Sequence, residues 1–290
     1  MDNSKTLSSA WSEACANNGG GVVLVPHGKF LVWPVRLQGP CNGPIGLRIN
    51  GILFPPAGNP LSTLDDWLSI RWVNNLAIDG EGWLNGRGST AWSCHSKGGG
   101  CGNLPITLKL TSVNTATIRD ITSINSKRIH FNVHGCHDIT FDHVTVIAPD
   151  KSPNTDGIHI SRSTGINIKN SVIGTGDDCI SLGPGSKDIN ITNVHCGPGH
   201  GISIGSLGRY PNEEDVTGIT VRDSTFTGTT NGVRIKSWST SLPSVVSKIA
   251  YINLQMNNVK NPIIIDESYC IDGSCDPNNK RVRNLRSVGF

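Results

Sequence analysis

Two neighbouring aspartates, Asp177 and Asp178, stand in the segment GTGDDCISLG, residues 174–183. The chain has only 22 acidic residues among 290, so an adjacent pair needs a reason. Like charges this close resist joint ionisation, and we expect one member of the pair to keep its proton near the working pH. A protonated carboxyl group beside an ionised one suits glycoside hydrolysis: one assists the leaving oxygen and the other activates water or attacks carbon.

Three residues repeat at one spacing around this pair. Asp156, Asp178 and His200 are separated by 22 and 22 residues, and each stands two positions before the first apolar residue of a strand-like segment. Equivalent positions on stacked strands lie about 4.8 Å apart. The spacing therefore predicts a ladder of Asp, Asp and His along one side of the fold, with Asp177 beside it and projecting differently from Asp178.

Two cations follow one repeat later. Arg234 and Lys236 share one face of a predicted strand, because alternate side chains of a strand point the same way. We expect them to converge with the acids and His200 on one exposed groove. Each residue alone suggests only a turn or a solvated surface, but the shared spacing favours a site. Acid clusters can also hold Ca²⁺; the adjacent cations argue against it, so we predict no metal and no other cofactor.

The elements that must position these residues form a repeat. Successive segments open with an alternating strand, pass a turn rich in Gly, Ser or Asn, and enter a second strand. A period of 20–30 residues built from short strands is typical of a solenoid. We therefore predict an all-β fold, a single-stranded right-handed parallel β-helix. A leucine-rich repeat is disfavoured because its leucine frame is missing. The first apolar residues of the repeats, 27, 22, 22 and 31 positions apart, are Phe131, Ile158, Ile180, Ile202 and Val233.

Strand alternation predicts which side chains form the core of this solenoid. Outward positions on the same strands are His159, Ser181, Ser203 and Arg234. Glycines 157, 201 and 232 share one rung, where we expect them to leave the groove open, while Cys179 fills that position beside the paired acids. The predicted inward stacks are Ile158/Ile160, Ile180/Leu182, Ile202/Ile204 and Val233/Ile235.

The segment SKTLSSAWSEACAN, residues 4–17, has the pattern of a short amphipathic helix. Its apolar face would carry Leu7, Trp11, Ala14 and Cys15, and we expect it to cap the open end of the solenoid. No linker or break in composition follows, so residues 1–290 are interpreted as one domain. No run of 18 apolar residues predicts a membrane span, and the N-terminal residues lack a hydrophobic signal segment.

Nine cysteines suggest an oxidising compartment. The spacings allow four local bridges and leave Cys136 alone, although free core thiols remain an alternative for each. The net charge of +3 permits an acidic ligand without demanding one. The four candidate bridges are Cys94–Cys101, Cys179–Cys196, Cys270–Cys275 and Cys15–Cys41.

Four ordered segments resemble the signature set of the polygalacturonases, glycoside hydrolase family 28. They are NTDGIHI (154–160), GTGDDCISLG (174–183), GPGHGISIGSLG (197–208) and GVRIKSW (232–238). The resemblance covers essentially the whole chain, and SLGRYPNEEDV is most similar to the plant, pollen-type exopolygalacturonases. It implies metal-free, inverting hydrolysis of α-1,4-linked galacturonan.

The resemblance also implies roles for the acids. Asp177 would be the general acid, while Asp156 and Asp178 would hold and deprotonate the attacking water. His200 would tune the protonation and orientation of the acid.

Substrate-binding roles are implied in the same way. Arg234 and Lys236 would bind the substrate carboxylate, with arginine suited to a two-pronged contact. Tyr269 matches a tyrosine that contacts the sugar in the family. Asn154 matches the first residue of the NTDG motif and would support Asp156.

Two features differ from the family. Its members normally carry a secretion signal and a segment before the first helix, and they continue for further coils beyond Tyr269. We therefore expect a chain truncated at both ends relative to the family, acting as a secreted, cell-wall monomer on pectin and binding neither nucleic acid nor a membrane. The alternatives are an endopolygalacturonase, a rhamnogalacturonan hydrolase, which the two cations disfavour, and a non-catalytic pectin-binding or allergen-like remnant.

Overall fold

The computed structural model describes residues 1–58, 65–93, 104–238, 242, 244–270 and, for the backbone, 284–289. Short strands dominate it. The elements are α1 (Ser4–Ala16), β1 (Gly21–Val25), β2 (Lys29–Leu31), β3 (Val35–Gln38), β4 (Ile45–Ile49), β5 (Ile52–Phe54), β6 (Asp66–Arg71), β7 (Asn74–Asp79), β8 (Trp83–Asn85), the 3₁₀ helix η1 (Gly88–Thr90), β9 (Ile106–Thr111), β10 (Asn114–Arg119), β11 (Thr122–Ile124), β12 (Phe131–His134), β13 (His137–Asp142), β14 (Thr145–Ile147), β15 (Ile158–Ser161), β16 (Thr164–Gly174), β17 (Ile180–Leu182), β18 (Lys187–Cys196), β19 (Ile202–Leu207), β20 (Val216–Arg222), β21 (Thr225–Thr227), β22 (Asn231–Trp238), β23 (Val245–Ile252), β24 (Gln255–Asn257), β25 (Asn261–Tyr269) and β26 (Asn284–Gly289).

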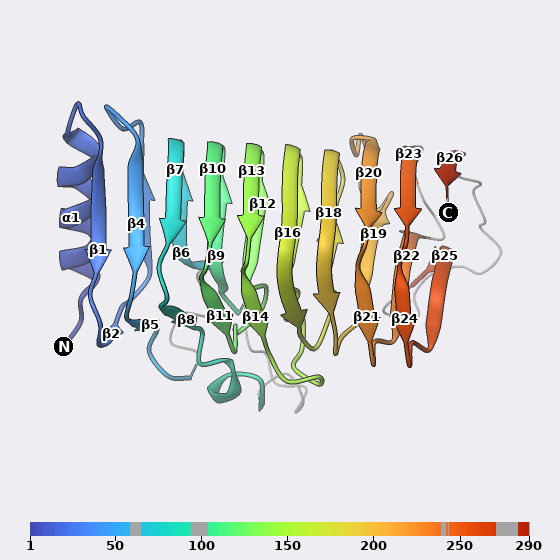
Figure 1. The fold of residues 1–290 in the computed structure, drawn as a ribbon, viewed down its shortest axis with the longest axis horizontal. Coiled ribbons are helices and arrows are strands. Elements are labelled where there is room, and N and C mark those ends of the chain that lie inside the picture. Colours follow the sequence, from blue (N-terminus) through green and yellow to red (C-terminus); the bar gives the residue numbers. More distant parts are fainter. Residues whose placement is uncertain (59–64, 94–103, 239–241, 243, 271–283, 290) are drawn as a thin grey trace.

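The strands stack as successive coils of a parallel β-helix, which confirms the predicted fold class (Figure 1). Within the described residues they form a 17-stranded sheet and a nine-stranded sheet. The nine-stranded sheet runs in the order β3, β6, β9, β12, β15, β17, β19, β22 and β25, and every pairing in it is parallel. Each strand of this sheet therefore lies one coil from the next, as the sequence repeat requires.

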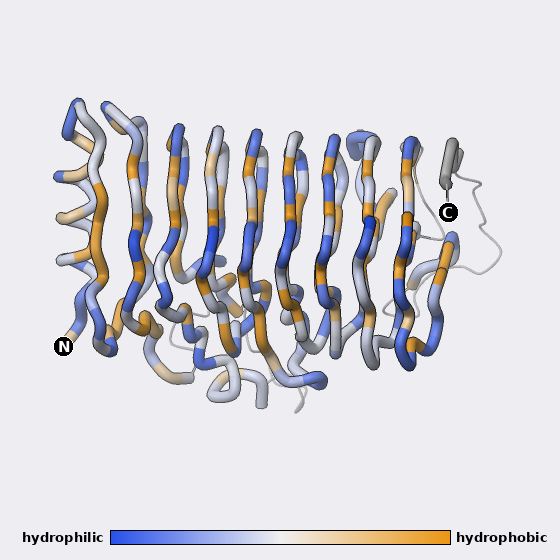
Figure 2. Tube along the Cα trace, in the orientation of Figure 1, coloured by the Kyte–Doolittle hydropathy of each residue, from blue (hydrophilic) through white to orange (hydrophobic). Residues whose placement is uncertain are grey.

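The predicted inward stacks form the core. Ile158 pairs in register with Ile180, Ile180 with Ile202, and Ile202 with Val233. The three isoleucines are no more than 1% exposed, and the second stack beside them, from Ile160 onward, is also buried. Burying one such side chain contributes roughly 1.5–3 kcal/mol, so the repetition stabilises the register. Hydrophobic and hydrophilic residues alternate along the coils (Figure 2).

Helix α1 covers the N-terminal end of the solenoid, as predicted (Figure 1). Leu7, Trp11 and Cys15 are buried against the core, and Ala14 is partly buried there. The indole Nε1 of Trp11 donates a hydrogen bond to the carbonyl of Gln38, 3.1 Å away. No helix in the described residues is long and apolar enough to cross a membrane.

Two of the candidate bridges are confirmed. Cys15 is bonded to Cys41 and Cys179 to Cys196. Cys136 is a buried free thiol, as expected. The remaining candidates, Cys94–Cys101 and Cys270–Cys275, lie wholly or partly outside the described residues.

The expectation about the glycines is wrong, because their missing side chains would point into neighbouring coils and not into a groove. A Cβ atom on Gly157 would lie 2.4 Å from the carbonyl oxygen of Cys179. At Gly201 it would lie 2.1 Å from the carbonyl oxygen of Asn231, and the φ there is +85°. Glycine allows the backbones of adjacent coils to approach at these points.

Candidate active site

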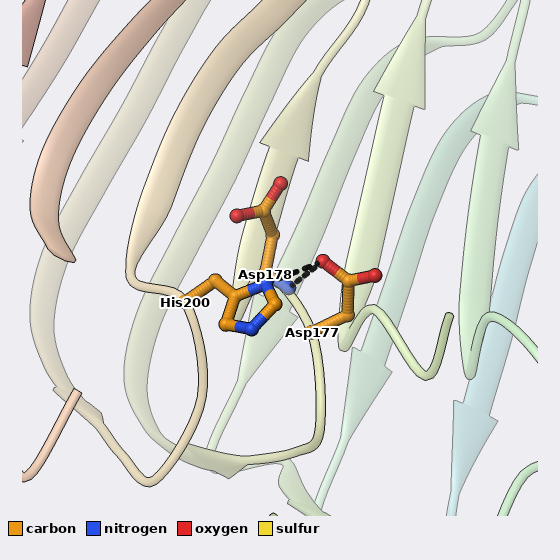
Figure 3. Close-up of side chains that lie close together, drawn as sticks. All are labelled: Asp177, Asp178 and His200. Atoms are coloured by element: carbon orange, nitrogen blue, oxygen red, sulfur yellow. Dashed lines mark hydrogen bonds and ion pairs between the residues drawn. The ribbon is translucent and has the colours of Figure 1, made fainter. Parts of the chain in front are cut away.

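The site lies where the chain turns into the strands of the nine-stranded sheet. Asp156 precedes β15, the pair Asp177 and Asp178 precedes β17, and His200 precedes β19. The two neighbouring aspartates project in different directions, as expected, and the His200 ring lies beside Asp177 (Figure 3). The carboxylates of Asp177 and Asp178 therefore have different partners.

Asp177 is paired with His200. Nδ1 of His200 lies 3.1 Å from Oδ1 of Asp177, and the backbone N–H of Asp178 donates to the same oxygen at 2.8 Å. Burial opposes ionisation of Asp177, but the hydrogen bond and charge of His200 outweigh it, so the pKa of Asp177 is lowered. The hydrogen bond to Asp177 in turn raises the pKa of His200 above its ordinary value of 6.5. The pair therefore holds one proton, mainly on the imidazole.

Asp178 is paired with the two predicted cations. Its Oδ1 lies 3.1 Å from Nη2 of Arg234, and its Oδ2 lies 2.9 Å from Nζ of Lys236. The hydroxyl of Ser203 also donates to Oδ1, at 2.7 Å. Asp178 is 1% exposed, and a buried carboxylate of this kind persists only when charge and hydrogen bonds compensate it. Each of the adjacent aspartates therefore has its own partner of opposite charge.

Asp156 is the carboxyl group that keeps a proton. Burial raises its pKa to about 7, with further contributions from the charges of Asp177 and Asp178. The hydroxyl of Ser181 donates to its Oδ2 at 2.7 Å and partly opposes this shift. The sequence led us to expect the retained proton on the adjacent pair; the structure places it one coil earlier, since Asp156 lacks a close cationic partner among the described residues.

The predicted ladder is present with one difference. The backbone N–H of Gly157 donates to the carbonyl of Asp178, so Asp156 and Asp178 do stand on adjacent coils. The backbone N–H of His200 donates to the carbonyl of Asp177, and its ring meets the Asp177 side chain. His200 therefore contacts the member of the pair that lies beside the ladder.

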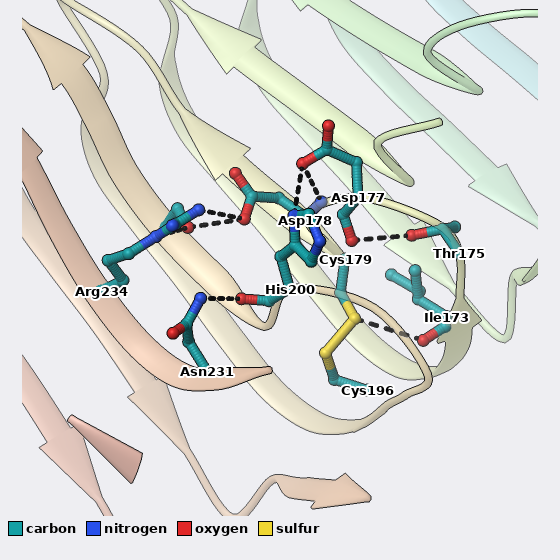
Figure 4. Close-up of a disulfide and its surroundings, with 10 residues drawn as sticks. Ile173, Thr175, Asp177, Asp178, Cys179, Cys196, His200, Asn231 and Arg234 are labelled. Atoms are coloured by element: carbon teal, nitrogen blue, oxygen red, sulfur yellow. Dashed lines mark hydrogen bonds and ion pairs between the residues drawn. A yellow bond between two sulfur atoms is a disulfide. The ribbon is translucent and has the colours of Figure 1, made fainter. Parts of the chain in front are cut away.

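A disulfide braces the turn that carries the two acids. Cys179 follows Asp178 directly and is bonded to Cys196 at the end of β18 (Figure 4). The hydroxyl of Thr175 donates to the carbonyl of Asp177 at 3.1 Å. These cross-links restrict the turn from both sides, which suits a site whose side chains must be held in fixed directions.

Tyr269 and Asn154 occupy different surroundings. Tyr269 ends β25 beside the cations, with Nζ of Lys236 lying 5.4 Å from its ring centre. Asn154 is exposed, with a left-handed φ of 52°, and among the described residues no hydrogen bond links it to Asp156. Its supporting role stays a prediction.

Sequence reasoning missed several partners of the site. Ser181 and Ser203 were expected to point outward, yet they are 3% and 0% exposed because the acids and cations cover them. The sequence feature that could have identified them is that they are polar residues on the same strand face as Arg234.

Two aromatic contacts near the cations were also missed. Trp238 packs edge-to-face against Tyr269, with ring centres 5.7 Å apart, and the guanidinium of Arg209 lies 4.8 Å from the Trp238 ring. No periodic signal marks Arg209, because it lies in a loop.

The loop that carries Arg209 borders a cleft of about 500 Å³. Glu213 holds this loop, because its carboxylate accepts hydrogen bonds from the backbone N–H groups of Gly208 and Tyr210. The cleft reaches the strand that follows Asp156 through His159 of β15. Its other lining residues include His134, Ser161, Arg162, Arg209 and Tyr210.

By distance alone, three side chains could hold a metal ion. Ligand atoms of Asp177, Asp178 and His200 all lie within 4.8 Å of one another. Both oxygens of Asp178, however, already accept charge-assisted hydrogen bonds from Arg234 and Lys236. A divalent cation would have to replace these fixed cations, so the donor set suits proton transfer better than metal binding.

The fold and the site define a parallel β-helix with an acid–base cluster on one face of adjacent coils. The sequence pattern of the glycosyl hydrolases family 28 matches residues 15–287, and the chain belongs to this family. Exopolygalacturonase of Platanus acerifolia is 47% identical over 292 aligned residues, covering 100% of this chain and 78% of that protein. Exopolygalacturonase of Oenothera organensis is also 47% identical, with coverage of 100% and 81%.

A solved structure is similar throughout. The polygalacturonase from Erwinia carotovora ssp. carotovora superposes with a TM-score of 0.80 at 25% sequence identity. The alignment covers 100% of this chain and 90% of that one. The β-helix therefore agrees with the fold of a solved polygalacturonase.

Proposed function

We propose that the protein hydrolyses α-1,4-galacturonosidic bonds of polygalacturonan, releasing galacturonate from chain ends with inversion at the anomeric carbon. The observation that carries the proposal is that three carboxyl groups on adjacent coils have different surroundings. One pairs with an imidazole, one with two cations, and one retains a proton to about pH 7. The exo mode is supported by relatives named exopolygalacturonase at 47% identity.

In this proposal Asp177 delivers the proton to the leaving glycosidic oxygen. The Asp177–His200 pair stores that proton, and one transfer across their 3.1 Å hydrogen bond moves it from imidazole to carboxylate. A bound sugar that displaces water from Asp177 would favour the neutral acid, because desolvation disfavours the charged form. General acid catalysis of this kind contributes about 10²–10⁴-fold to a rate.

Asp156 and Asp178 act as the groups that hold and deprotonate the attacking water. Asp178 is paired with Arg234 and Lys236, while Asp156 must first lose its proton. The same two cations bind the carboxylate of the galacturonate unit, sharing their donors between it and Asp178. Arginine suits this task because its planar fork can serve two carboxylates at once.

The surroundings of the cations support a sugar-binding wall. Tyr269 and Trp238 present aromatic surface next to Lys236, and Arg209 lies against Trp238.

The remaining parts of the proposal concern Asn154 and the setting of the enzyme. Asn154 is proposed to support Asp156. The two disulfides support secretion to an oxidising compartment such as the cell wall. We propose that the chain acts there as one domain and as a monomer.

Product analysis on polygalacturonate tests the function. Galacturonate as the sole early product, with slow loss of viscosity, is the expected result. A mixture of oligomers with rapid loss of viscosity would show an endo-acting enzyme. No products from a folded protein that still binds the polymer would identify a non-catalytic pectin-binding protein.

A further inference from the structure

A hydrogen-bonded chain leads from the catalytic carboxyl group Asp156 to the cleft beside the site. Ser181 Oγ lies 2.7 Å from Asp156 Oδ2, and Nδ1 of His159 lies 2.8 Å from the same Ser181 oxygen. Ser181 is 3% exposed, so water does not compete for these bonds. His159 is also one of the residues that line the cleft of about 500 Å³.

We propose that Ser181 and His159 form a proton relay that transfers the proton of Asp156 to water in this cleft. His159 is a positioning residue that acts on Asp156 through Ser181. The inference rests on the proposed function, in which Asp156 must be ionised before it can accept a proton from water. It adds a route for that proton through the cleft that His159 lines.

Hydrogen-bond directions settle how the relay works. When Asp156 is ionised, the single Ser181 hydrogen is donated to its carboxylate, so Ser181 accepts from Nδ1–H of His159. When Asp156 is protonated, its O–H can donate to Ser181, and Ser181 then donates to an unprotonated Nδ1. In that state the neutral ring carries its hydrogen on Nε2.

One concerted shift converts the second state into the first. The Asp156 proton moves to Ser181 Oγ, the Ser181 proton moves to Nδ1 of His159, and the Nε2 proton leaves to water in the cleft. Asp156 becomes ionised, Ser181 remains a hydroxyl and His159 remains neutral, so one proton is released to the cleft. Before the next release, the Ser181 hydroxyl must turn back toward His159, and the ring must return its hydrogen from Nδ1 to Nε2 by exchange with water in the cleft.

The charges around the relay suit a neutral ring. Burial lowers the pKa of His159 to about 4, so the imidazolium form is not trapped. Lys236, His134 and Arg128 also disfavour the charged ring, and Asp178 opposes them. Asp156 itself faces Asp177, Asp178, Lys236 and, from the preceding coil, Arg128. These groups keep the proton exchanging between Asp156 and the cleft without storing it on the histidine.

The chain contains a matched control one strand away. Nδ1 of His134 lies 3.0 Å from Oγ of Ser161, and both residues line the same cleft. Among the described residues, Ser161 reaches no carboxylate. Ser161→Ala therefore removes the same kind of histidine–serine bond, and His134→Asn replaces the same kind of ring, without touching a catalytic acid.

The first test needs no activity. The pKa of Asp156 is measured by carbon-13 NMR titration of its carboxyl group in the ligand-free protein. Ser181→Ala removes a donor to the ionised form, so the pKa of Asp156 should rise. His159→Asn keeps an N–H donor to Ser181, so this variant should leave the Asp156 pKa near the wild-type value. An unchanged pKa in Ser181→Ala would overturn the relay at its first bond.

The second test measures turnover of trigalacturonate. Ser181→Ala should lower kcat roughly tenfold, the effect of losing a hydrogen bond to a charged group. His159→Asn should also lower kcat, because an amide has no second ring nitrogen to pass the proton on, and KM should change little in both variants. The solvent deuterium isotope effect should report several moving protons in the wild type and fewer in both variants. Equal losses in Ser161→Ala, or unchanged kcat in His159→Asn, would overturn the relay. A wild-type protein without hydrolytic activity would instead overturn the proposed function.

Discussion

Nδ1 of His200 lies 3.1 Å from Oδ1 of Asp177, whereas Asp178, the next residue, faces Arg234 and Lys236. Two adjacent carboxylates therefore have separate positive partners from later coils. The arrangement explains how the chain tolerates the pair, and it separates the Asp177–His200 couple from an acid that is held by two cations.

Asp177→Asn should remove proton delivery while keeping the shape of the side chain. We expect kcat on polygalacturonate to fall by at least about 10²-fold, the contribution of a positioned general acid, with binding nearly unchanged. The control is Asp120→Asn, an exposed aspartate with a φ of 56° that asparagine also adopts readily. Normal turnover in the Asp177 variant would contradict its assignment as the acid.

The pH dependence of kcat/KM should be bell-shaped. The acid limb follows ionisation of Asp156, whose pKa is raised to about 7, and the alkaline limb follows loss of the proton shared by Asp177 and His200. In His200→Ala the proton shared by this pair would be held by the Asp177 carboxyl group without an imidazole partner. The alkaline limb should therefore move to lower pH, which narrows the pH profile of kcat/KM. An alkaline limb at the wild-type pH would exclude His200 from the chemistry.

Asp156→Asn should stabilise the ligand-free protein above pH 7. The folded pKa of Asp156 is raised from 3.8 to about 7, so the unfolded chain ionises first as pH increases. Ionisation therefore favours unfolding progressively between these values, and the amide removes that effect. Thermal unfolding should show a higher Tm for the variant at pH 8 and little difference at pH 3. Equal stability at pH 8 would show that folding does not raise the pKa of Asp156.

Lys236→Met should destabilise the fold by about 3 kcal/mol, because it leaves buried Asp178 with only one cationic partner. Lys236 and Asp178 are 8% and 1% exposed in their side chains, so water cannot replace the lost contact. Combining it with Asp178→Asn should recover most of the loss in a double-mutant cycle of denaturant unfolding. Simple additivity of the two changes would mean that the ion pair contributes nothing.

Arg234→Gln should weaken binding of free polygalacturonate more than binding of fully methyl-esterified pectin. The guanidinium reads a carboxylate charge, which the ester lacks. Binding can be measured by calorimetry in an Asp177→Asn background, where the substrate is not consumed. Equal losses on the two polymers would assign Arg234 to holding Asp178 and not to reading the substrate.

The sequence by itself determined the architecture and brought the three acids, His200 and the two cations of the candidate site together. The 22-residue spacing of Asp156, Asp178 and His200 is periodic, and strand alternation assigns inward and outward positions without knowledge of distant contacts. Stacks such as Ile158, Ile180 and Ile202 therefore followed directly from the repeat, and the structure pairs these residues in register.

Only the tertiary structure decided which acid holds a proton. The cations that face Asp178 lie 56 and 58 residues along the chain, and nothing local distinguishes Asp178 from Asp177 as their partner. Desolvation of Asp156 likewise arises from packing against neighbouring coils. A repeat places residues on the same face, but the direction of each side chain and its access to water depend on the atoms packed around it. Those contacts set the pKa of each group, and they exist only in the folded chain.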